Sequence, residues 1–560
     1  MKKLSKVLVL VLSTIMVLAM SASVFAAPGD LTTDTSISVT DLAVGDVVTY
    51  YQIVEWSDNE GWVFVEPFKT ALTADEQKAV IGDKTTPGQI TQAVADKIAG
   101  AATSGTTDPA LTGTTWTKNN PDPGLYMVVV AAKESGVVYN PAFVAADYTE
   151  GGSNTISIKA TYSDTAVAKK TDFETKKKVN LYEDSEEIQA AKASMIGEIV
   201  SFNTTTLVPV FLDSYKNPSF TLVDTVSTGM ELVVDEDHPI TLTYGSATAT
   251  CTGASGGDDN VTITKDNTTT YTADFASEYL DANIVPVPVT VTYYAKITSD
   301  ATFNVNRMNN TVKVTYSNGP GTEKGVEKDV TNHYTFSIGA SIIGKQGKKG
   351  YEAVKVGVDK DGNELQELTE VTLDNGDDTT TARSLAGATF GLYKTEAAAQ
   401  AGGTSGDDFI GSFVTLDDGI ISFKGLDADT YYLKELSAPA GFVADTAVHP
   451  VVITATYEEK NITETVDGME VKYQTSVLKD YTVTIDGKST KYEFDNEGPT
   501  LVDPVIKDIT TEEARIKNTK GVELPATGGI GTTIFYILGS LLVVGCGVVL
   551  ISKKRMENNK

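Results

Sequence analysis

Hydrophobic and polar residues alternate in short runs through most of the chain. Valine and tyrosine alternate with threonine over 289–293 and with threonine and lysine over 311–316, and glycine, asparagine and aspartate separate such runs. Side chains of a strand point alternately to the two faces of a sheet, so this period of two predicts strands buried on one face. A helical period is limited to 73–99 and 185–195. Many short strands with turn signals are typical of β-sandwiches, and an all-β chain is predicted.

Changes in the strand pattern place domain boundaries near residues 165 and 333, without proline-rich linkers between the segments. The body of the chain is therefore predicted to hold three domains, at 27–165, 166–333 and 334–520. The length of 560 residues accommodates this number of domains. Short connections between consecutive β-sandwiches predict an elongated rod.

The N-terminal end has the pattern of a secretory signal peptide. Lys2 and Lys3 precede an apolar stretch over 7–20, and small residues follow up to Ala26. A positive region, an apolar region and a small-residue cleavage site in this order predict removal of 1–26 on secretion. The mature chain is expected to begin near Ala27.

The C-terminal end combines a short motif with an apolar run and a basic tail. Leu524, Pro525, Ala526, Thr527 and Gly528 precede the almost wholly apolar segment 530–551. A segment of 22 residues is long enough to span a bilayer as a helix. The tail at 552–560 carries a Lys-Lys-Arg run and is expected to stay cytoplasmic.

This arrangement resembles the LPxTG sorting signal of Gram-positive surface proteins. The resemblance implies that a membrane-bound sortase cleaves between Thr527 and Gly528. The carbonyl of Thr527 would then pass through a thioester on the sortase cysteine to an amine. A protein of this kind is secreted and becomes covalently anchored in the cell wall.

Composition excludes some functions and raises a question of stability. The formal net charge of −30 argues against nucleic acid as a partner, because phosphate binding requires clustered Lys and Arg. The histidines are isolated from nucleophiles and from metal-ligand spacing, so no metal, cofactor or enzymatic activity is expected. Cys546 lies in the apolar C-terminal run, which leaves Cys251 without a disulfide partner in the folded body. A large extracellular protein without disulfides is a candidate for stabilisation by another kind of covalent crosslink.

The third predicted domain contains residue types that could form such a staple. Tyr431, Leu433 and Glu435 alternate onto one strand face, and Lys345 and Asn518 each share a face with an isoleucine. Burial favours the neutral forms of an amine and of a carboxylic acid. A neutral Lys345 could attack the amide carbon of Asn518 while protonated Glu435 polarises the carbonyl, releasing ammonia and leaving an isopeptide bond.

Two stretches of this domain resemble a known family. Residues 431–442 resemble the E-box of Cna-B-type domains, with Leu436 and Phe442 departing from the usual pattern, and 385–393 match a typical strand of that family. The resemblance implies immunoglobulin-like β-sandwiches of the Cna type. In the second domain, Lys177, Asp224 and Asn310 resemble the lysine, aspartate and asparagine of the isopeptide-forming fimbrial domain. Close competitors there are Lys176, Lys178 and Asn309.

The first domain resembles the N-terminal domain of shaft pilins. The likeness lies in two stretches, Pro-Gly-Leu-Tyr at 123–126 and Val-Val-Tyr-Asn-Pro at 137–141. Val167 followed by Lys170 resembles the pilin motif, in which the lysine accepts the acyl group of the next subunit; Lys169 is the alternative. The motif's usual Tyr-Pro is absent.

The resemblances together imply the shaft subunit of a covalently polymerised pilus on a Gram-positive cell. The implied partners are a class C pilin sortase, a housekeeping sortase, other pilin subunits and peptidoglycan, and a host surface ligand is an additional candidate. The alternatives are a monomeric LPxTG wall-anchored adhesin and a minor or basal pilin.

Overall fold

The computed structural model describes a large part of the chain. The described residues are 36–57, 59–82, 90–146, 150–151, 155–156, 164–167, 170–172, 174–180, 191–211, 215, 217–283, 285–301, 307–319, 324–339, 349–374, 379–501, 505–521, 538–540 and 542–543. The predicted signal peptide, sorting motif and basic tail lie outside these residues. So does most of the predicted span at 530–551. Within the described part of the chain, no helix is long and apolar enough to cross a membrane.

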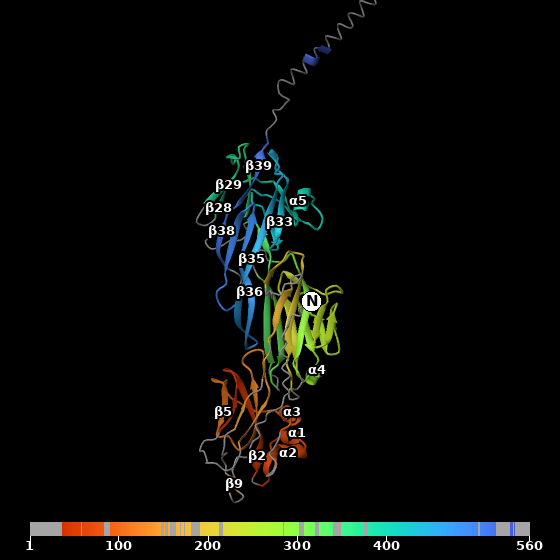
Figure 1. The fold of residues 1–560 in the computed structure, drawn as a ribbon, viewed down its shortest axis with the longest axis vertical. Helices are drawn as coiled ribbons and strands as arrows, with labels where there is room; N and C mark the ends of the chain where they lie inside the picture. The colour runs from red at the N-terminus through yellow and green to blue at the C-terminus, as the bar shows by residue number, and fades with distance from the viewer. Residues whose placement is uncertain are drawn as a thin grey trace, which may run out of the picture.

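Strands dominate the structure, as the alternating pattern predicts, and they form an elongated stack of three modules (Figure 1). We call these the N-terminal module (residues 36–172), the middle module (174–334) and the C-terminal module (336–521). Strands through Asp172 pair within the N-terminal module, a few residues past the predicted boundary at 165. Domain limits as such remain a prediction.

The N-terminal module combines small sheets with three short helices. One sheet has the order β11-β1-β5, another the order β3-β2-β6-β8 with β4 beside β2, and β12 pairs with β7. Its elements are β1 (Ser36–Thr40), β2 (Val47–Ser57), β3 (Gly61–Phe64), α1 (Phe68–Ala71), α2 (Ala74–Ile81), α3 (Gln92–Ala101), β4 (Thr106–Thr107), β5 (Thr115–Asn119), β6 (Gly124–Ala131), β7 (Val137–Tyr139), β8 (Ala142–Ala146), β9 (Glu150–Gly151), β10 (Thr155–Ile156), β11 (Asp164–Val167) and β12 (Lys170–Asp172).

The helices of this module confirm the helical period predicted over 73–99. Thr73 caps α2 in a reciprocal box with Glu76, which satisfies backbone donors that the first helical turn leaves without partners. The second predicted helix, at 185–195, is wrong where the structure describes it, because Ala191–Ala193 is strand β14. Its alanines are buried against the C-terminal core, and its backbone pairs in parallel with β25, so tertiary pairing overrides the local pattern.

The middle module is a sandwich of two sheets. One has the order β13-β15-β23-β18-β19 with β17 beside β23, and the other the order β14-β25-β24-β16-β22-β21-β20. The elements are β13 (Lys176–Asn180), β14, β15 (Ile199–Val208), β16 (Phe220–Val226), β17 (Met230–Val233), β18 (Ile240–Tyr244), β19 (Ala247–Cys251), β20 (Ser255–Gly257), β21 (Val261–Lys265), β22 (Thr270–Phe275), α4 (Ser277–Ala282), β23 (Val287–Ile297), β24 (Met308–Ser317) and β25 (Lys324–Tyr334). Cys251 is a free, buried cysteine of its core.

The C-terminal module places a seven-stranded sheet, β31-β30-β33-β35-β36-β37-β38, beside the sheet β27-β39-β34. Short pairs β26-β32 and β28-β29 complete it. The elements are β26 (Phe336–Ile338), β27 (Ala353–Val358), β28 (Glu370–Asp374), β29 (Thr379–Arg383), β30 (Thr389–Tyr393), α5 (Glu396–Ala401), β31 (Phe409–Val414), β32 (Phe423–Leu426), β33 (Thr430–Ser437), β34 (Phe442–Val443), β35 (Val448–Val466), β36 (Met469–Ile485), β37 (Lys488–Asp495), β38 (Val505–Thr511) and β39 (Ala514–Lys520).

Strands β35 and β36 form a hairpin far longer than its neighbours. Its base belongs to the C-terminal sheet, and in Figure 1 its outer half runs alongside the middle module towards the N-terminal module. The turn at Asp467 and Gly468 has positive φ at both residues, the geometry that matches the twist of a two-residue hairpin loop.

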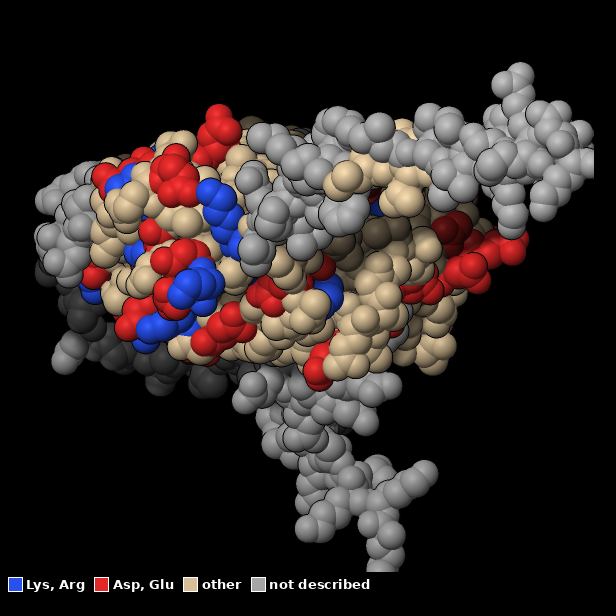
Figure 2. All heavy atoms as spheres, turned by 90° about the horizontal axis from the view of Figure 1, so that it is seen from above, with Lys and Arg blue, Asp and Glu red and all other residues tan. Residues whose placement is uncertain are grey.

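Surface charges are mixed on the face seen along the long axis. Figure 2 shows Lys and Arg side chains among Asp and Glu on the left of this view, whereas the described surface on the right carries mainly Asp and Glu among uncharged residues. The formal net charge of −30 means that neighbouring molecules repel one another, which favours solubility.

Candidate functional site

The middle module buries a lysine, an aspartate and an asparagine at one place in its core. We call Lys177, Asp224 and Asn310 the middle triad; they lie on β13, β16 and β24. Lys177 comes from one sheet of the sandwich, and the other two residues come from neighbouring strands of the facing sheet. Their exposed fractions are 2%, 0% and 0%, so the sandwich core encloses all three side chains.

Tyr293 on β23 connects the members of this triad. Lys177 Nζ donates hydrogen bonds to Asp224 and, at 2.5 Å, to the hydroxyl of Tyr293. That hydroxyl donates to Asp224 Oδ1 at 2.6 Å and accepts from Asn310 Nδ2 at 2.5 Å. The tyrosine hydroxyl therefore contacts the amine, the acid and the amide at once.

Burial favours the uncharged forms of this amine and acid. Desolvation lowers the pKa of Lys177, although Asp224 opposes the shift. Desolvation raises the pKa of Asp224, with Lys177 and Tyr293 opposing. A neutral amine is a nucleophile, and a protonated acid can donate to the amide carbonyl. Among the described residues, Asn310 Oδ1 has no hydrogen-bond partner, so this carbonyl is available to such a donor.

The structure also separates the middle triad from its competitors. The side chain of Lys176 is 54% exposed beside Glu174. Asn309 is half-buried and accepts a hydrogen bond from Arg307 Nε at 2.6 Å, away from the core. The side chain of Lys178 lies outside what the structure describes. Lys177 and Asn310 are the pair that the fold brings to the acid.

A second cluster lies in the C-terminal module. We call Lys355, Glu435 and Asn518 the C-terminal triad; they lie on β27, β33 and β39. Lys355 Nζ donates to Glu435 Oε2 at 3.3 Å, and Asn518 Nδ2 donates to the same oxygen at 2.8 Å. Lys355 and Asn518 are fully buried, and Glu435 is 4% exposed. The predicted acid and asparagine are therefore in contact.

The lysine that the structure describes beside Glu435 is Lys355. Lys345 lies outside the described residues, and the structure places Lys355 beside Glu435. Desolvation lowers the pKa of Lys355, with Glu435 opposing. Among the described residues, Glu435 Oε1 and Asn518 Oδ1 have no hydrogen-bond partners. Both oxygens are buried, so each lacks the hydrogen bond that a buried polar atom normally has.

Local structure explains how β27 delivers its lysine. β27 pairs in parallel with β39, and Gly357 lies opposite Asn518. A Cβ at Gly357 would come within 2.4 Å of Leu368 and 2.9 Å of Phe442, so glycine permits this close packing. Lys355 Nζ lies 5.2 Å from the centre of the Phe390 ring, which helps to shield the amine from water.

Sequence reasoning missed Lys355 and Tyr293 as members of the two clusters. A signal for Lys355 was present, because it is the only charged residue in the segment 353–358, which otherwise consists of three valines, an alanine and a glycine. Tyr293 carried no distinguishing signal, because its position on an alternating strand predicts only a hydrophobic core residue. Its role depends on the sheet opposite, which the sequence does not place.

The edge of β13 beside the middle triad is held by two buried carboxyl groups of β25. Asp329 Oδ2 accepts from Lys177 N at 2.6 Å, and Glu327 Oε2 accepts from Thr175 N at 3.2 Å. Desolvation raises the pKa of each of these carboxyl groups to about 7. The acids thus take the place of a neighbouring strand along this edge.

These two acids predict that the middle module is more stable in acid than at neutral pH. The folded state keeps both protons up to about pH 7, whereas unfolded carboxyl groups release them near pH 4. The free energy of unfolding therefore falls as the pH rises from about 4 to 7 and is then constant. Calorimetry at pH 5 and pH 8 should give the lower melting temperature at pH 8.

The matched control is the Glu327→Gln and Asp329→Asn double variant, whose amide oxygens can still accept from the same backbone groups. This variant should lose most of the pH dependence between 5 and 8. An unchanged slope in the variant would assign the pH dependence to other groups.

The remaining predicted site residues are placed only in part. Lys170 begins β12, where it pairs with Tyr139 of β7, and nothing is described of its side chain. Lys169, Leu524, Pro525, Ala526, Thr527 and Gly528 lie outside the described residues.

Comparisons with protein families give two matches. Residues 369–467, which include Glu435, match the SpaA family, a prealbumin-like fold domain. Residues 516–558, which include Asn518 and the Leu-Pro-Ala-Thr-Gly motif, match the LPXTG cell wall anchor motif.

Comparisons with individual proteins give similar chains from Streptococcus pyogenes and Corynebacterium diphtheriae. The trypsin-resistant surface T6 protein of Streptococcus pyogenes serotype M6 is 23% identical over 472 residues, covering 79% of this chain and 80% of the relative. The solved T6 backbone pilin of that serotype has a TM-score of 0.54 at 18% identity, covering 88% of this chain and all of the other. The full-length major pilin SpaD of Corynebacterium diphtheriae has a TM-score of 0.46 at 15% identity, with coverage of 88% and 100%.

The T6 backbone pilin is described as a modular three-domain structure decorated with variable loops and extensions. The likeness to it shows that this chain shares its fold.

Proposed function

We infer that this chain, a sortase-assembled major pilin anchored to the cell wall, repeats along the pilus shaft with covalent bonds both inside and between its subunits. The observation that carries this inference is the presence of two buried lysine–acid–asparagine triads in a chain that ends in a cell wall anchor motif. Stacked modules with internal crosslinks suit a structural subunit that must resist pulling.

The internal bonds form without another enzyme. Neutral Lys177 Nζ attacks the side-chain amide carbon of Asn310, and Lys355 attacks that of Asn518. Asp224 and Glu435, in their protonated forms, polarise the carbonyl and carry a proton from the attacking amine to the leaving nitrogen. One C–N bond forms, one breaks, and one ammonia leaves in each case. Burial supplies the contact and the neutral amine that the reaction requires.

The bonds between subunits need a sortase. A class C pilin sortase cleaves between Thr527 and Gly528 and holds the Thr527 carbonyl as a thioester. The amine of Lys170 on another subunit attacks it; the new amide forms, the C–S bond breaks, and the amine proton passes to the sortase thiolate. Lys169 is the alternative acceptor. A housekeeping sortase finally transfers the polymer to peptidoglycan, and a host surface ligand remains a further candidate partner.

Both kinds of bond define a short covalent path through the subunit. Force applied between Lys170 and Thr527 passes along residues 170–177 and crosses to Asn310 through the crosslink of the middle module. It then follows residues 310–355, crosses to Asn518 through the crosslink of the C-terminal module, and continues along residues 518–527. The rest of the middle and C-terminal modules lies outside this path, so its strands need not resist the pull by hydrogen bonds alone.

Replacement of Lys169 and Lys170 by arginine should collapse polymerisation, because arginine keeps the charge and lacks a nucleophilic amine. Immunoblots of cell wall extracts boiled in detergent should show a ladder for the natural protein and a single species for the variant. Lys176→Arg is the matched control, since its side chain is exposed nearby. A single band from the natural protein would favour a monomeric adhesin. A ladder from the double variant would show that neither lysine is the acceptor in polymerisation.

A further inference from the structure

The outer half of the β35–β36 hairpin leaves the C-terminal module and crosses the whole middle module. Beyond an irregularity between Thr456 and Tyr457, the strands no longer lie beside β33 and β37. They pack on β25 instead, in a cluster formed by Val326, Val330, Ile462, Met469, Val471 and Tyr473.

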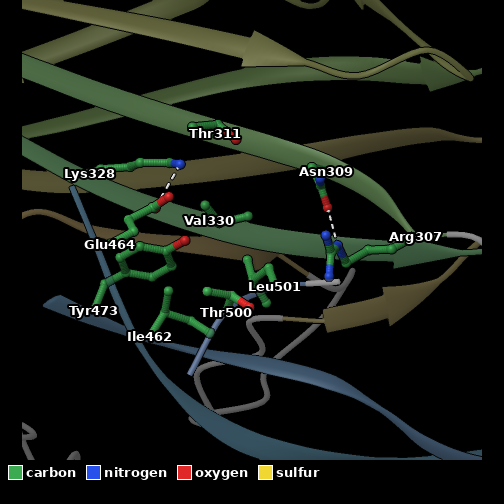
Figure 3. A pocket seen from close by; sticks show the side chains of 10 residues that line it. All are labelled: Arg307, Asn309, Thr311, Lys328, Val330, Ile462, Glu464, Tyr473, Thr500 and Leu501. Atoms are coloured by element: carbon green, nitrogen blue, oxygen red, sulfur yellow. Dashed lines mark hydrogen bonds and ion pairs between the residues drawn. The ribbon is translucent and has the colours of Figure 1, made fainter. Parts of the chain in front are cut away.

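Specific polar contacts fix the hairpin on β25. Thr475 Oγ1 donates to Val330 O at 2.6 Å, and Asn332 Nδ2 donates to Ser476 O at 2.7 Å. Figure 3 shows Tyr473 and Glu464 of the hairpin facing Lys328, whose amine lies 2.7 Å from Glu464. The hairpin is thus seated on the middle module along its length.

The tip of the hairpin reaches the N-terminal module. Ser135 N donates to Glu470 O at 3.3 Å, and Lys472 Nζ lies 3.0 Å from Glu134 Oε1. Lys133 Nζ donates to Gly468 O at 3.4 Å. Residues more than three hundred positions apart in the chain therefore meet at this point.

The segment contacted by the tip leads directly into β7. The middle module holds the same segment from the other direction, since Gly136 N donates to Tyr316 at 2.8 Å and Tyr215 donates to Tyr139 O at 3.2 Å. β7 in turn pairs with β12, which begins at Lys170. All three modules thus meet where the candidate acceptor strand is held.

We propose that the hairpin tip, through Gly468, Glu470 and Lys472, positions the acceptor strand β12 for the sortase reaction by fixing the segment 133–135 ahead of β7. The proposal rests on the proposed function, in which Lys170 is the acceptor. These tip residues act through β7 and do not touch the reacting atoms.

The geometry gives the physical reason. β7 and β12 are three residues each and form a sheet of two strands, which is marginally stable by itself. Anchors on both sides of β7 limit its motion and so keep β12 paired. Because one of the anchors belongs to the C-terminal module, a subunit presents its acceptor fully only after that module has folded.

The test uses purified sortase and two forms of the whole secreted chain. The donor form keeps the sorting motif and carries Lys169→Arg and Lys170→Arg, and the acceptor form keeps the lysines and carries Thr527→Ala. In the tip variant, residues 463–472 are replaced by Asn-Gly, a sequence suited to a two-residue hairpin turn. This variant retains Ile462, Tyr473 and Thr475 on β25.

As an acceptor, the tip variant should show a KM about tenfold higher with an unchanged kcat, because only a fraction of molecules would present a formed β12. As a donor, the tip variant should react with the same kinetic constants as the chain with the natural hairpin. The rate of amide hydrogen exchange should rise at 137–139 and 170–172. Equal KM values for the two acceptors would overturn the positioning role. If the natural pair forms no product, the proposed acceptor fails and the positioning role falls with it.

Reversal of the charges of one ion pair distinguishes a positioning role of the tip from a general loss of folding. Lys472→Glu should raise the acceptor KM by up to about fivefold, the range expected for an exposed ion pair. Addition of Glu134→Lys should restore it. Lys488→Glu, which disrupts the exposed Lys488–Glu512 pair elsewhere on the C-terminal module, is the matched control and should have no effect. Failure of the exchange to restore KM would contradict a role for this contact.

Discussion

Replacement of Lys355 by methionine is expected to leave the secreted chain without its C-terminal crosslink. Methionine keeps most of the buried volume and lacks the amine, so one ammonia is not released and the mass deficit is smaller by that amount. The loop between 355 and 518 has about 160 residues, and its loss costs about 5 kcal/mol of unfolding free energy in the chain-entropy model. The melting temperature of the module should fall by about 10–20 °C.

Lys345→Met is the matched control for this experiment. The sequence pattern alone favours Lys345, and the contact with Glu435 favours Lys355. If Lys345→Met reduces the mass deficit by one ammonia and Lys355→Met leaves it at two, the assignment made from the structure is wrong.

Replacement of Asp224 by alanine is expected to remove the crosslink of the middle module. Lys177 and Asn310 would still lie in the core, but the group that polarises the amide and relays the proton would be absent. The loop between 177 and 310 has about 130 residues, so the loss is again about 5 kcal/mol. Intact mass and calorimetry should report one ammonia retained and a lower melting temperature for this module alone.

Tyr293→Phe provides a graded comparison at the same site. It removes the hydroxyl that joins all three members of the middle triad and keeps the ring packed against Phe202 at 5.3 Å. The crosslink should form more slowly, leaving a mixture of linked and unlinked molecules soon after folding. A complete crosslink in Asp224→Ala at the rate of the natural protein would contradict the assigned role of the acid.

The inward positions of both clusters could be predicted because their strands are buried on one face. Asp224 on β16 and Glu435 on β33 alternate with exposed or half-buried residues, so the period of two assigns their faces correctly. The same pattern placed Asn310 and Asn518 inward. A carboxylic acid on the buried face of a predicted strand is therefore a signal of a candidate site that a single sequence can supply.

Lys355 escaped prediction because β27 is buried on both faces. All six of its residues are buried, so alternation carries no information about which side a residue takes. Only the parallel pairing with β39, which joins segments about 160 residues apart, identifies the side chain that meets Glu435. Sequence pattern alone does not specify such long-range pairing.

The hairpin was beyond prediction for a related reason. Residues 448–466 and 469–485 alternate as strands should, and β-strands of 19 and 17 residues are far longer than the usual five or six. The buried residues of the outer half, such as Ile462 and Val471, face another module rather than their own. Periodicity reports that a face is covered without reporting which surface covers it.

The intact mass of the mature secreted chain, measured after denaturation, tests the central claim most directly. We expect a mass two ammonia molecules below the value calculated from the sequence, with fragment spectra joining 177 to 310 and 355 to 518. A mass equal to the calculated value would show that neither buried lysine has reacted, and the explanation of this fold as a covalently stapled shaft subunit would be contradicted.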